Sequence, residues 1–336
     1  MIERPSNAGR NHVSNHFKHN TRLMRMNSVP TQNDVTESVS PITAPKWGLV
    51  CITISDQVRF RTITRARFLA FDAEKRRDVL RELYADNLRR LHTALEFCRE
   101  NYIGLYRMTS ALFPLNDETE GEMILTELAP ALADIGAKAR LYDIRVVIHP
   151  DQYIVLSSDS ASVVATSVHL LTQHGRILDL LGLDRSPWAT MILHGGKSDR
   201  DDRLVETISM LPDCVKSRLC LENDEYAYGA EDILRVCRRA GIPMVFDAHH
   251  HVVHDKLDTY EDSSIAFFTD AARETWQVPD WQLVHLSNGS ESFRDPKHSD
   301  LITLVPSAFE KVSWIEVEAK GKEEAIAALR RTTNLS

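Results

Sequence analysis

The stretch MVFDAHHHVV (residues 244–253) places Asp247 and three consecutive histidines directly after an apolar run. Five other apolar runs also reach a histidine or an acidic residue. The six residues are His149, His194, Glu222, Asp247, His285 and Glu318. Imidazole nitrogens and carboxylate oxygens are the ligands that bind divalent transition metals. The question for the rest of the chain is whether its fold can bring these residues together at one metal site.

Eight short apolar runs, each of strand length and bounded by polar residues, glycine or proline, follow one another along the chain. They begin at Trp47, Ile103, Ile144, Ala189, Ser217, Ile242, Trp281 and Ser313. Amphipathic segments lie between them, most clearly over 73–101, 160–182 and 229–241, the last closed by Gly241 as a helix C-cap. Strands that alternate with helices in this way predict an α/β protein with a (β/α)8 TIM barrel.

The predicted domain organisation is a tail followed by one domain. Residues 1–45 are rich in Asn, Ser, Thr, Arg and Pro and have almost no apolar periodicity, which predicts a disordered N-terminal tail. Residues 46–336 then form the TIM-barrel domain. The structural alternative, a doubly wound open sheet, would need a glycine-rich phosphate turn after its first strand to bind a dinucleotide. The segment there, ISDQVRF, is not such a turn.

Composition excludes some classes of protein. No run approaches the roughly 20 apolar residues that a membrane helix needs, and the N-terminus lacks a secretory signal. Five scattered cysteines indicate reduced thiols, so we expect a cytoplasmic protein with no membrane association. The net charge of −8 argues against a nonspecific chromatin-like binder but allows a local basic rim. We expect a monomer with no obligate protein partner.

A barrel would bring the six residues together, because its strands end at one rim. A lone histidine or acid at a strand end is more often a satisfied polar residue or a helix cap, but six in register would share one crevice. Clustered carboxylates repel one another unless cations are bound. His250 and His298 can join the cluster, whereas His249, His251 and His254 cannot all do so. Eight ligands are too many for one ion, so two or three ions are expected.

The motifs then show a resemblance over the whole chain after the tail. They are YRMTSALFPL (106–115), VVIHPDQYIVLSS (146–158), LHGGK (193–197), LENDE (221–225), GIPMVFDAHHH (241–251), VHLSNG (284–289), KHSDLI (297–302) and EVEAKGKEEAI (316–326). In this order they resemble the UV damage endonucleases, which are related in fold to endonuclease IV. No single motif is decisive, but together they are specific.

The resemblance implies a metal-dependent DNA repair endonuclease. Such an enzyme nicks double-stranded DNA immediately 5′ to cyclobutane pyrimidine dimers and 6-4 photoproducts, with abasic sites as a further candidate substrate. Manganese is the expected ion, with zinc and magnesium as alternatives. Carried over residue by residue, the metal ligands are His149, His194, Glu222, Asp247, His250, His285, His298 and Glu318.

Other roles follow from the same resemblance and from residue chemistry. Glu222, His149 and Lys197 are the expected catalytic residues, and Arg107, Lys197 and Lys320 are the expected phosphate contacts. Gln152 and Tyr153 match the pair that probes the lesion. A photodimer stacks poorly, so its extrusion costs little, and an inserted tyrosine ring can fill the gap. On residue type alone, Tyr153 would more readily be a core aromatic beneath the loop.

Two positions depart from the family pattern. A lysine, which can be carboxylated to help hold metal, commonly lies two residues before the strand-seven histidine, but Leu283 stands there. A tyrosine commonly follows the glycine of the first strand, but Leu49 stands there. A leucine cannot bind an ion, so either one metal is held more weakly or another group compensates.

Two other functions are compatible with a metal site on a barrel. A metal-dependent sugar isomerase or epimerase would need one or two ions and acid–base carboxylates, but it would not explain eight ligands or the pair Gln152 and Tyr153. A noncatalytic metal-binding protein is the other alternative, and nothing in the sequence favours it. Incision of UV-irradiated plasmid with manganese separates the three functions.

Overall fold

The computed structural model describes residues 45–332. Parallel strands close into a barrel in the order of the chain, because β1 pairs with both β2 and β8. The strands are β1 (Lys46–Val50), β2 (Leu105–Met108), β3 (Arg145–Ile148), β4 (Met191–His194), β5 (Leu219–Glu222), β6 (Met244–Asp247), β7 (Leu283–Leu286) and β8 (Trp314–Val317). The prediction of a (β/α)8 barrel is therefore confirmed. The predicted tail, residues 1–45, lies outside the described residues except for its last position.

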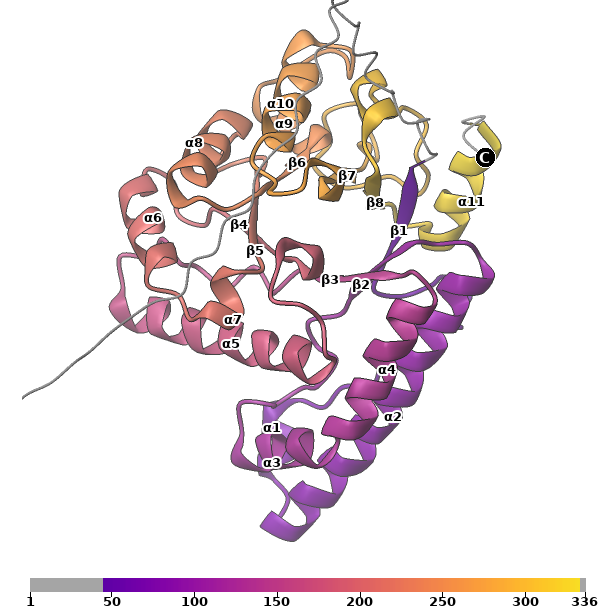
Figure 1. The fold of residues 1–336 in the computed structure, drawn as a ribbon, viewed down its shortest axis with the longest axis vertical. Helices are drawn as coiled ribbons and strands as arrows, with labels where there is room; N and C mark the ends of the chain where they lie inside the picture. The colour runs from indigo at the N-terminus through magenta and orange to yellow at the C-terminus, as the bar shows by residue number, and fades with distance from the viewer. Residues whose placement is uncertain (1–44, 333–336) are drawn as a thin grey trace, which may run out of the picture. The chain divides into compact units, whose positions relative to one another are not determined.

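Helices surround the barrel, and the long helix α2 lies beside α4 (Figure 1). The helices are α1 (Arg65–Leu69), α2 (Ala73–Glu100), α3 (Thr119–Glu127), α4 (Ala129–Leu141), α5 (Ala161–Leu180), α6 (Asp201–Ser209), α7 (Asp213–Lys216), α8 (Ala230–Ala240), α9 (Ala248–His254), α10 (Ser263–Arg273) and α11 (Lys322–Thr332). Among residues 45–332, no helix is long and apolar enough to cross a membrane. The three amphipathic segments that the sequence singled out are α2, α5 and α8.

Alternate strand positions form two separate apolar layers. A large cluster fills the space between strands and helices, and it contains Leu49 and Tyr106. A smaller cluster contains Leu105, Val147, Ile192, Cys220, Val245, Trp276, Leu283 and Trp314. Most of these residues come from successive strands at positions whose side chains point into the barrel. The barrel interior is thus closed by packed side chains below the rim where the candidate ligands lie.

A buried arginine closes the base of the barrel. Arg145, at the start of β3, donates hydrogen bonds to the carbonyls of Pro187, Trp188 and Trp281 at 2.8–2.9 Å. Its guanidinium also lies 4.9 Å from the ring centroid of Trp188 and 5.3 Å from that of Trp314. The carbonyls and aromatic faces offset part of the cost of burying this charge. Burial nevertheless lowers the pKa of Arg145 to about 9.

The first strand is shorter than its apolar run. The apolar run that begins at Trp47 continues to Ile54, but β1 ends at Val50 because Cys51 adopts a left-handed backbone conformation with φ of 61°. The amide of Ile52 then donates to the carbonyl of Val50 at 2.7 Å. This tight turn directs the chain away from the barrel axis, and Cys51 lines the cavity above it.

Gly241 allows a test of the local energetics. It ends α8 in the left-handed region (φ 68°, ψ 36°), as predicted for a C-cap, and a Cβ there would meet nothing within 4 Å. Gly241→Ala should therefore lower the free energy of unfolding by about 1 kcal/mol through backbone conformation alone. Gly241→Asn should lose less, since asparagine tolerates this region. Equal stability of all three proteins in urea unfolding would contradict this account.

Candidate metal centre

The six residues from the strand ends meet at one rim of the barrel. The strand register places His194 beside Glu222 and Asp247 beside His285. His149 and Glu318 each follow the last residue of their strands, β3 and β8. Adjacent parallel strands are about 4.8 Å apart, so their terminal side chains can share ligands. The rim therefore has the spacing of a multinuclear metal site.

Glu222 occupies the centre of this cluster and is almost completely buried. Its carboxylate lies 3.0 Å from His149 Nε2 and 2.8 Å from His285 Nδ1. His250 Nδ1 and His194 Nε2 lie 3.4 Å and 3.9 Å away. Four imidazoles from four different elements thus converge on one carboxylate.

Three overlapping groups have ligand atoms within 4.8 Å of one another. They are His149, His194 and Glu222; Glu222, Asp247 and His250; and Asp247, His285 and Glu318. Glu222 and Asp247 each belong to two groups and could bridge ions. The groups include seven of the eight expected ligands.

His298, the eighth expected ligand, reaches the rim through a folded loop. An antiparallel bridge joins Gly289 to His298, and the amide of Ser299 donates to the carbonyl of Asn288 at 2.8 Å. His298 Nδ1 then lies 3.7 Å from Glu318 Oε2. The loop returns to the rim as the sequence suggested.

The three consecutive histidines belong to helix α9 and face different ways. Asp247 is the N-cap of this helix, and its Oδ1 accepts from the amide of His250 at 2.8 Å. His250 faces the cluster of candidate ligands around Glu222. His249 is bonded to Tyr260 and to the carbonyl of Asp295, and His251 to Ser264. These two rings are therefore committed elsewhere, and His254 is bonded to Asp255.

The orientation of the rings and one unpaired oxygen fit bound cations. His149 Nδ1 lies 3.0 Å from the carbonyl of Pro150, and His250 Nδ1 lies 2.9 Å from that of Asn223. Each ring can thus donate Nδ1–H and keep the Nε2 lone pair for an ion, the usual arrangement at metal sites. Asp247 Oδ2 is buried with no hydrogen-bond partner within residues 45–332. Such an oxygen is stabilised by a metal ion.

The charges at the rim shift several pKa values. Burial alone would raise the pKa of Glu222, but the imidazoles of His285 and His194 outweigh it and hold this pKa well below its usual value. Burial opposes the charged form of His250, but Asp247 and Glu222 raise its pKa to about 9. Against the same effect of burial, Glu222 and Glu316 raise the pKa of His285 to about 10.

A cavity of about 620 Å³ opens above the cluster. His149, His194, Glu222, His250, His298 and Glu318 line it, together with Arg107, Gln152, Glu225 and Lys320. Tyr153 lies beside this cavity and is 66% exposed, with its hydroxyl 2.9 Å from Asp151. Tyr153 is therefore not a core aromatic. The pair Gln152 and Tyr153 projects from the loop after β3 toward solvent.

The expected phosphate contacts have different environments. Arg107 is buried, donates a hydrogen bond to Glu318 at 2.5 Å and forms an ion pair with Glu316 at 2.6 Å. Lys320 lines the cavity and donates to Ser290 at 3.2 Å. Lys197 is half-exposed, forms an ion pair with Asp159, and does not line this cavity.

Gly196, directly before Lys197, allows the close approach of two loops. Gly196 has φ of 82°, and a Cβ there would lie 2.8 Å from Ser157 Oγ. That hydroxyl donates to the carbonyl of Gly195 at 2.9 Å and accepts from the amide of Lys197 at 2.7 Å. The loops after β3 and β4 are thereby fastened together beside the metal cluster.

Sequence reasoning missed three residues at the site. Asn223 exchanges two hydrogen bonds with the backbone of Asp247, at 2.9 and 3.0 Å, and so joins the ends of β5 and β6. Glu225 Oε1 lies 3.7 Å from His250 Nε2. Glu316 is fully buried beneath His285. The motifs LENDE and EVEAK contain all three, but residue type alone did not distinguish them from surface charges.

The two departures from the family pattern lie away from the ligands. Leu283 is fully buried in the interior layer with Trp276 and Trp314, below the level of His285. Leu49 is fully buried in the layer between strands and helices. Neither leucine lines the cavity above the cluster.

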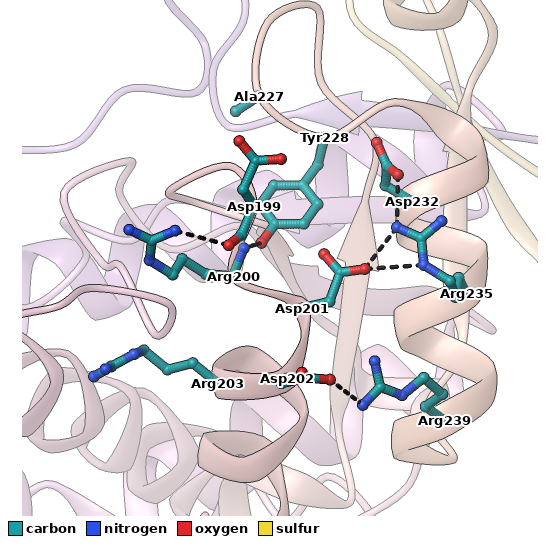
Figure 2. Close-up of a pocket in the computed structure, with 10 residues that line it drawn as sticks. All are labelled: Asp199, Arg200, Asp201, Asp202, Arg203, Ala227, Tyr228, Asp232, Arg235 and Arg239. Atoms are coloured by element: carbon teal, nitrogen blue, oxygen red, sulfur yellow. Dashed lines mark hydrogen bonds and ion pairs between the residues drawn. The ribbon is translucent and has the colours of Figure 1, made fainter.

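A second cavity, of about 470 Å³, lies between α6 and α8 (Figure 2). Arg235 bridges Asp201 and Asp232 at 2.6–2.9 Å, and Arg239 is paired with Asp202 at 2.6 Å. The charged side chains of this cavity are therefore paired with one another, and none of the three candidate ligand groups lies there.

Comparison with known proteins agrees with this geometry. A UV DNA damage endonuclease of Nostoc sp. is 55% identical over 288 residues, which cover 85% of this chain and 89% of the relative. The crystal structure of SacUVDE has a TM-score of 0.72 at 25% identity and covers 85% of this chain and 98% of that one. Endonuclease IV from Thermus thermophilus has a TM-score of 0.50 at 16% identity over 73% of this chain and 93% of its own, a likeness of fold alone.

These findings define first a class, an endonuclease built on a TIM barrel. The model of the UV-endonuclease UvdE family matches residues 45–336, and the chain belongs to this family. The resemblance inferred from the motifs is therefore confirmed. The chain is an enzyme, and the sugar isomerase and noncatalytic alternatives are set aside.

The raised pKa values of His250 and His285 predict proton release on metal binding. After metal removal by chelation, both rings should be protonated at pH 7.5, because their pKa values are about 9 and 10. A metal ion at either ring must displace a proton. Manganese affinity should therefore rise with pH, by up to about tenfold per unit for each displaced proton, and level off near pH 10.

Calorimetric titration in buffers of different ionisation enthalpy measures the protons released. His285→Ala should lower the count by about one, whereas His169→Ala, a change at an exposed histidine of α5, should leave it unchanged. A binding heat that does not depend on the buffer would contradict the assignment of these protons.

Proposed function

We propose that this enzyme is a DNA repair endonuclease that requires two or three divalent ions, preferentially manganese, with zinc and magnesium as substitutes. It nicks the strand immediately 5′ to cyclobutane pyrimidine dimers and 6-4 photoproducts in double-stranded DNA, and it also acts at abasic sites. The observation that carries the proposal is the convergence of three ligand groups on Glu222 and Asp247. Bound ions of this kind activate a water molecule and stabilise the leaving oxygen of a phosphodiester.

The residues at the rim would hold the ions and orient the groups that react. His149, His194 and Glu222 supply one group of donors, and Asp247 and His250 extend it from the start of α9. The buried carboxylates remain ionised at neutral pH, because neighbouring imidazoles lower the pKa of Glu222 and Arg107 and His285 lower that of Glu318. His149 and Glu222 touch both the cavity and each other, which suits them to the catalytic step.

The positive side chains suit contacts with the DNA backbone. Lys320 and Arg107 line the cavity, and Lys197 lies on the loop after β4. Because Arg107 is bonded to two carboxylates, we assign Lys320 the more direct contact with phosphate. Lys197 would meet the strand farther from the cluster, where its pairing with Asp159 is exposed and weak.

Gln152 and Tyr153 are assigned to lesion recognition. Gln152 lines the cavity, and the exposed ring of Tyr153 stands beside it. A flat ring and an amide at this position can fill the gap that an extruded photodimer leaves in the duplex. We further propose that the enzyme acts as a monomer in the cytoplasm, which agrees with five cysteines that form no disulfide.

Glu222→Gln tests the catalytic centre. A neutral amide is a far poorer ligand for these cations, so incision should fall at least about a hundredfold and bound manganese should decrease. Binding to lesion DNA should persist, because Lys320 and Tyr153 are unchanged. The matched control is Glu231→Gln, an exposed position on α8. Near-normal incision by the Glu222 variant at saturating manganese would remove this residue from the site.

The double change of Gln152 and Tyr153 to alanine tests lesion recognition. It removes a stacking face worth roughly 1–3 kcal/mol, so incision at a photodimer should fall about 5- to 150-fold. Incision at an abasic site should fall less, because less stacking must be disrupted there. Manganese content should not change.

Tyr102→Ala is the control, since Tyr102 is 87% exposed and precedes β2 at the opposite end of the barrel. Rates are compared on duplexes that carry a single dimer or a single abasic site. Equal loss on both substrates, or loss of metal, would mean that the pair supports the catalytic centre instead.

A further inference from the structure

Glu316 is a buried carboxylate with an unexplained position. It lies on β8 with 0% exposure, one alternation below Glu318. Neither of its oxygens forms a well-oriented hydrogen bond within residues 45–332, although Oε1 lies 2.6 Å from Arg107 Nη1. Burying a carboxylate with so few partners lowers the stability of the folded protein. Its presence here therefore calls for a function that offsets this cost.

The ring of His285 connects Glu316 to the metal cluster. The two residues are paired across the β7–β8 ladder, and His285 Nε2 lies 3.3 Å from Glu316 Oε1. The other ring nitrogen, Nδ1, lies 2.8 Å from Glu222 and 3.4 Å from Glu318. The Nδ1 edge of the imidazole therefore meets two expected ligands. The Nε2 edge meets Glu316, a carboxylate that is outside the three ligand groups.

The surroundings leave His285 Nε2 no alternative acceptor. Within residues 45–332 it has no hydrogen-bond partner. The layer beneath is apolar and contains Leu283 and Trp314. Glu316 Oε1, at 3.3 Å, is thus the carboxylate oxygen that this nitrogen faces among the described residues.

We infer that Glu316 is a positioning residue for the metal centre, an inference that rests on the proposed metal dependence. Its carboxylate lies 3.3 Å from Nε2 and is placed to accept Nε2–H of His285 when metal is bound, so that the Nδ1 lone pair would be free for an ion held by Asp247 and Glu318. A carboxylate behind a metal-bound histidine fixes the tautomer and increases the basicity of the ligand. Glu316 also holds Arg107, which binds Glu318 at 2.5 Å.

Two substitutions distinguish the effect of the acceptor oxygen of Glu316 from the effect of its negative charge. Glu316→Gln keeps an acceptor oxygen for His285 but removes the charge, and Glu316→Leu removes both at similar volume. Manganese binding is measured by electron paramagnetic resonance titration of the chelator-treated protein without DNA. Thermal melting of each variant shows whether it is folded. Glu316→Leu should weaken the affinity of at least one ion about 10- to 100-fold, and Glu316→Gln should weaken it less. Glu310→Gln, an exposed change before β8, should match the unaltered protein.

A double-mutant cycle decides whether Glu316 acts through His285. In a His285→Ala background, Glu316→Gln should cause no further loss of manganese affinity. Additive losses, or normal affinity and stoichiometry in Glu316→Leu, would overturn the inference. If Glu316→Leu does not fold, the glutamine variant and the cycle still decide. Failure of the unaltered protein to bind manganese would instead overturn the proposed function.

Discussion

Buried negative charge at one rim of the barrel is the constraint on which the rest of the site depends. Glu222, Asp247, Glu316 and Glu318 lie within one cluster, and their side chains are buried or nearly so. Carboxylates so close together in a medium of low dielectric repel one another strongly. Arg107 and the surrounding histidines offset part of this charge, and the divalent ions of the proposed function would offset the remainder. Under the proposed function, the negative charge of the site would thus be balanced only with cations bound.

The barrel supplies the rigidity that such a cluster needs. Packed interior side chains and the buried Arg145 close it below the rim, so the strand ends cannot move apart. Helix α9 begins at the rim itself, and its cap residue Asp247 uses one carboxylate oxygen for the helix and presents the other to the cluster. By contrast, Gln152 and Tyr153, the proposed lesion probe, lie on the loop after β3. Recognition on a loop above a rigid catalytic centre is the usual division of work in this fold.

Much of this arrangement could be predicted because it depends on local patterns. The apolar runs determine the strands, and histidines or acids at their ends must meet once the barrel closes. Other features depend on tertiary geometry. The start of α9 at Ala248 determines which of the histidines from 249 to 254 faces the cluster. The pairing of Glu316 with His285 across neighbouring strands determines the role inferred for Glu316. The early end of β1 depends on one left-handed residue, Cys51, inside an otherwise strand-like run.

Anomalous diffraction at the manganese edge, from crystals of the full chain grown with manganese, would locate the bound ions directly. We expect two or three anomalous peaks at the rim, in coordination contact with the groups that share Glu222 and Asp247, and with Glu316 outside the first coordination sphere. Absence of peaks at the rim, or a single ion bound without Glu222, would contradict this expectation.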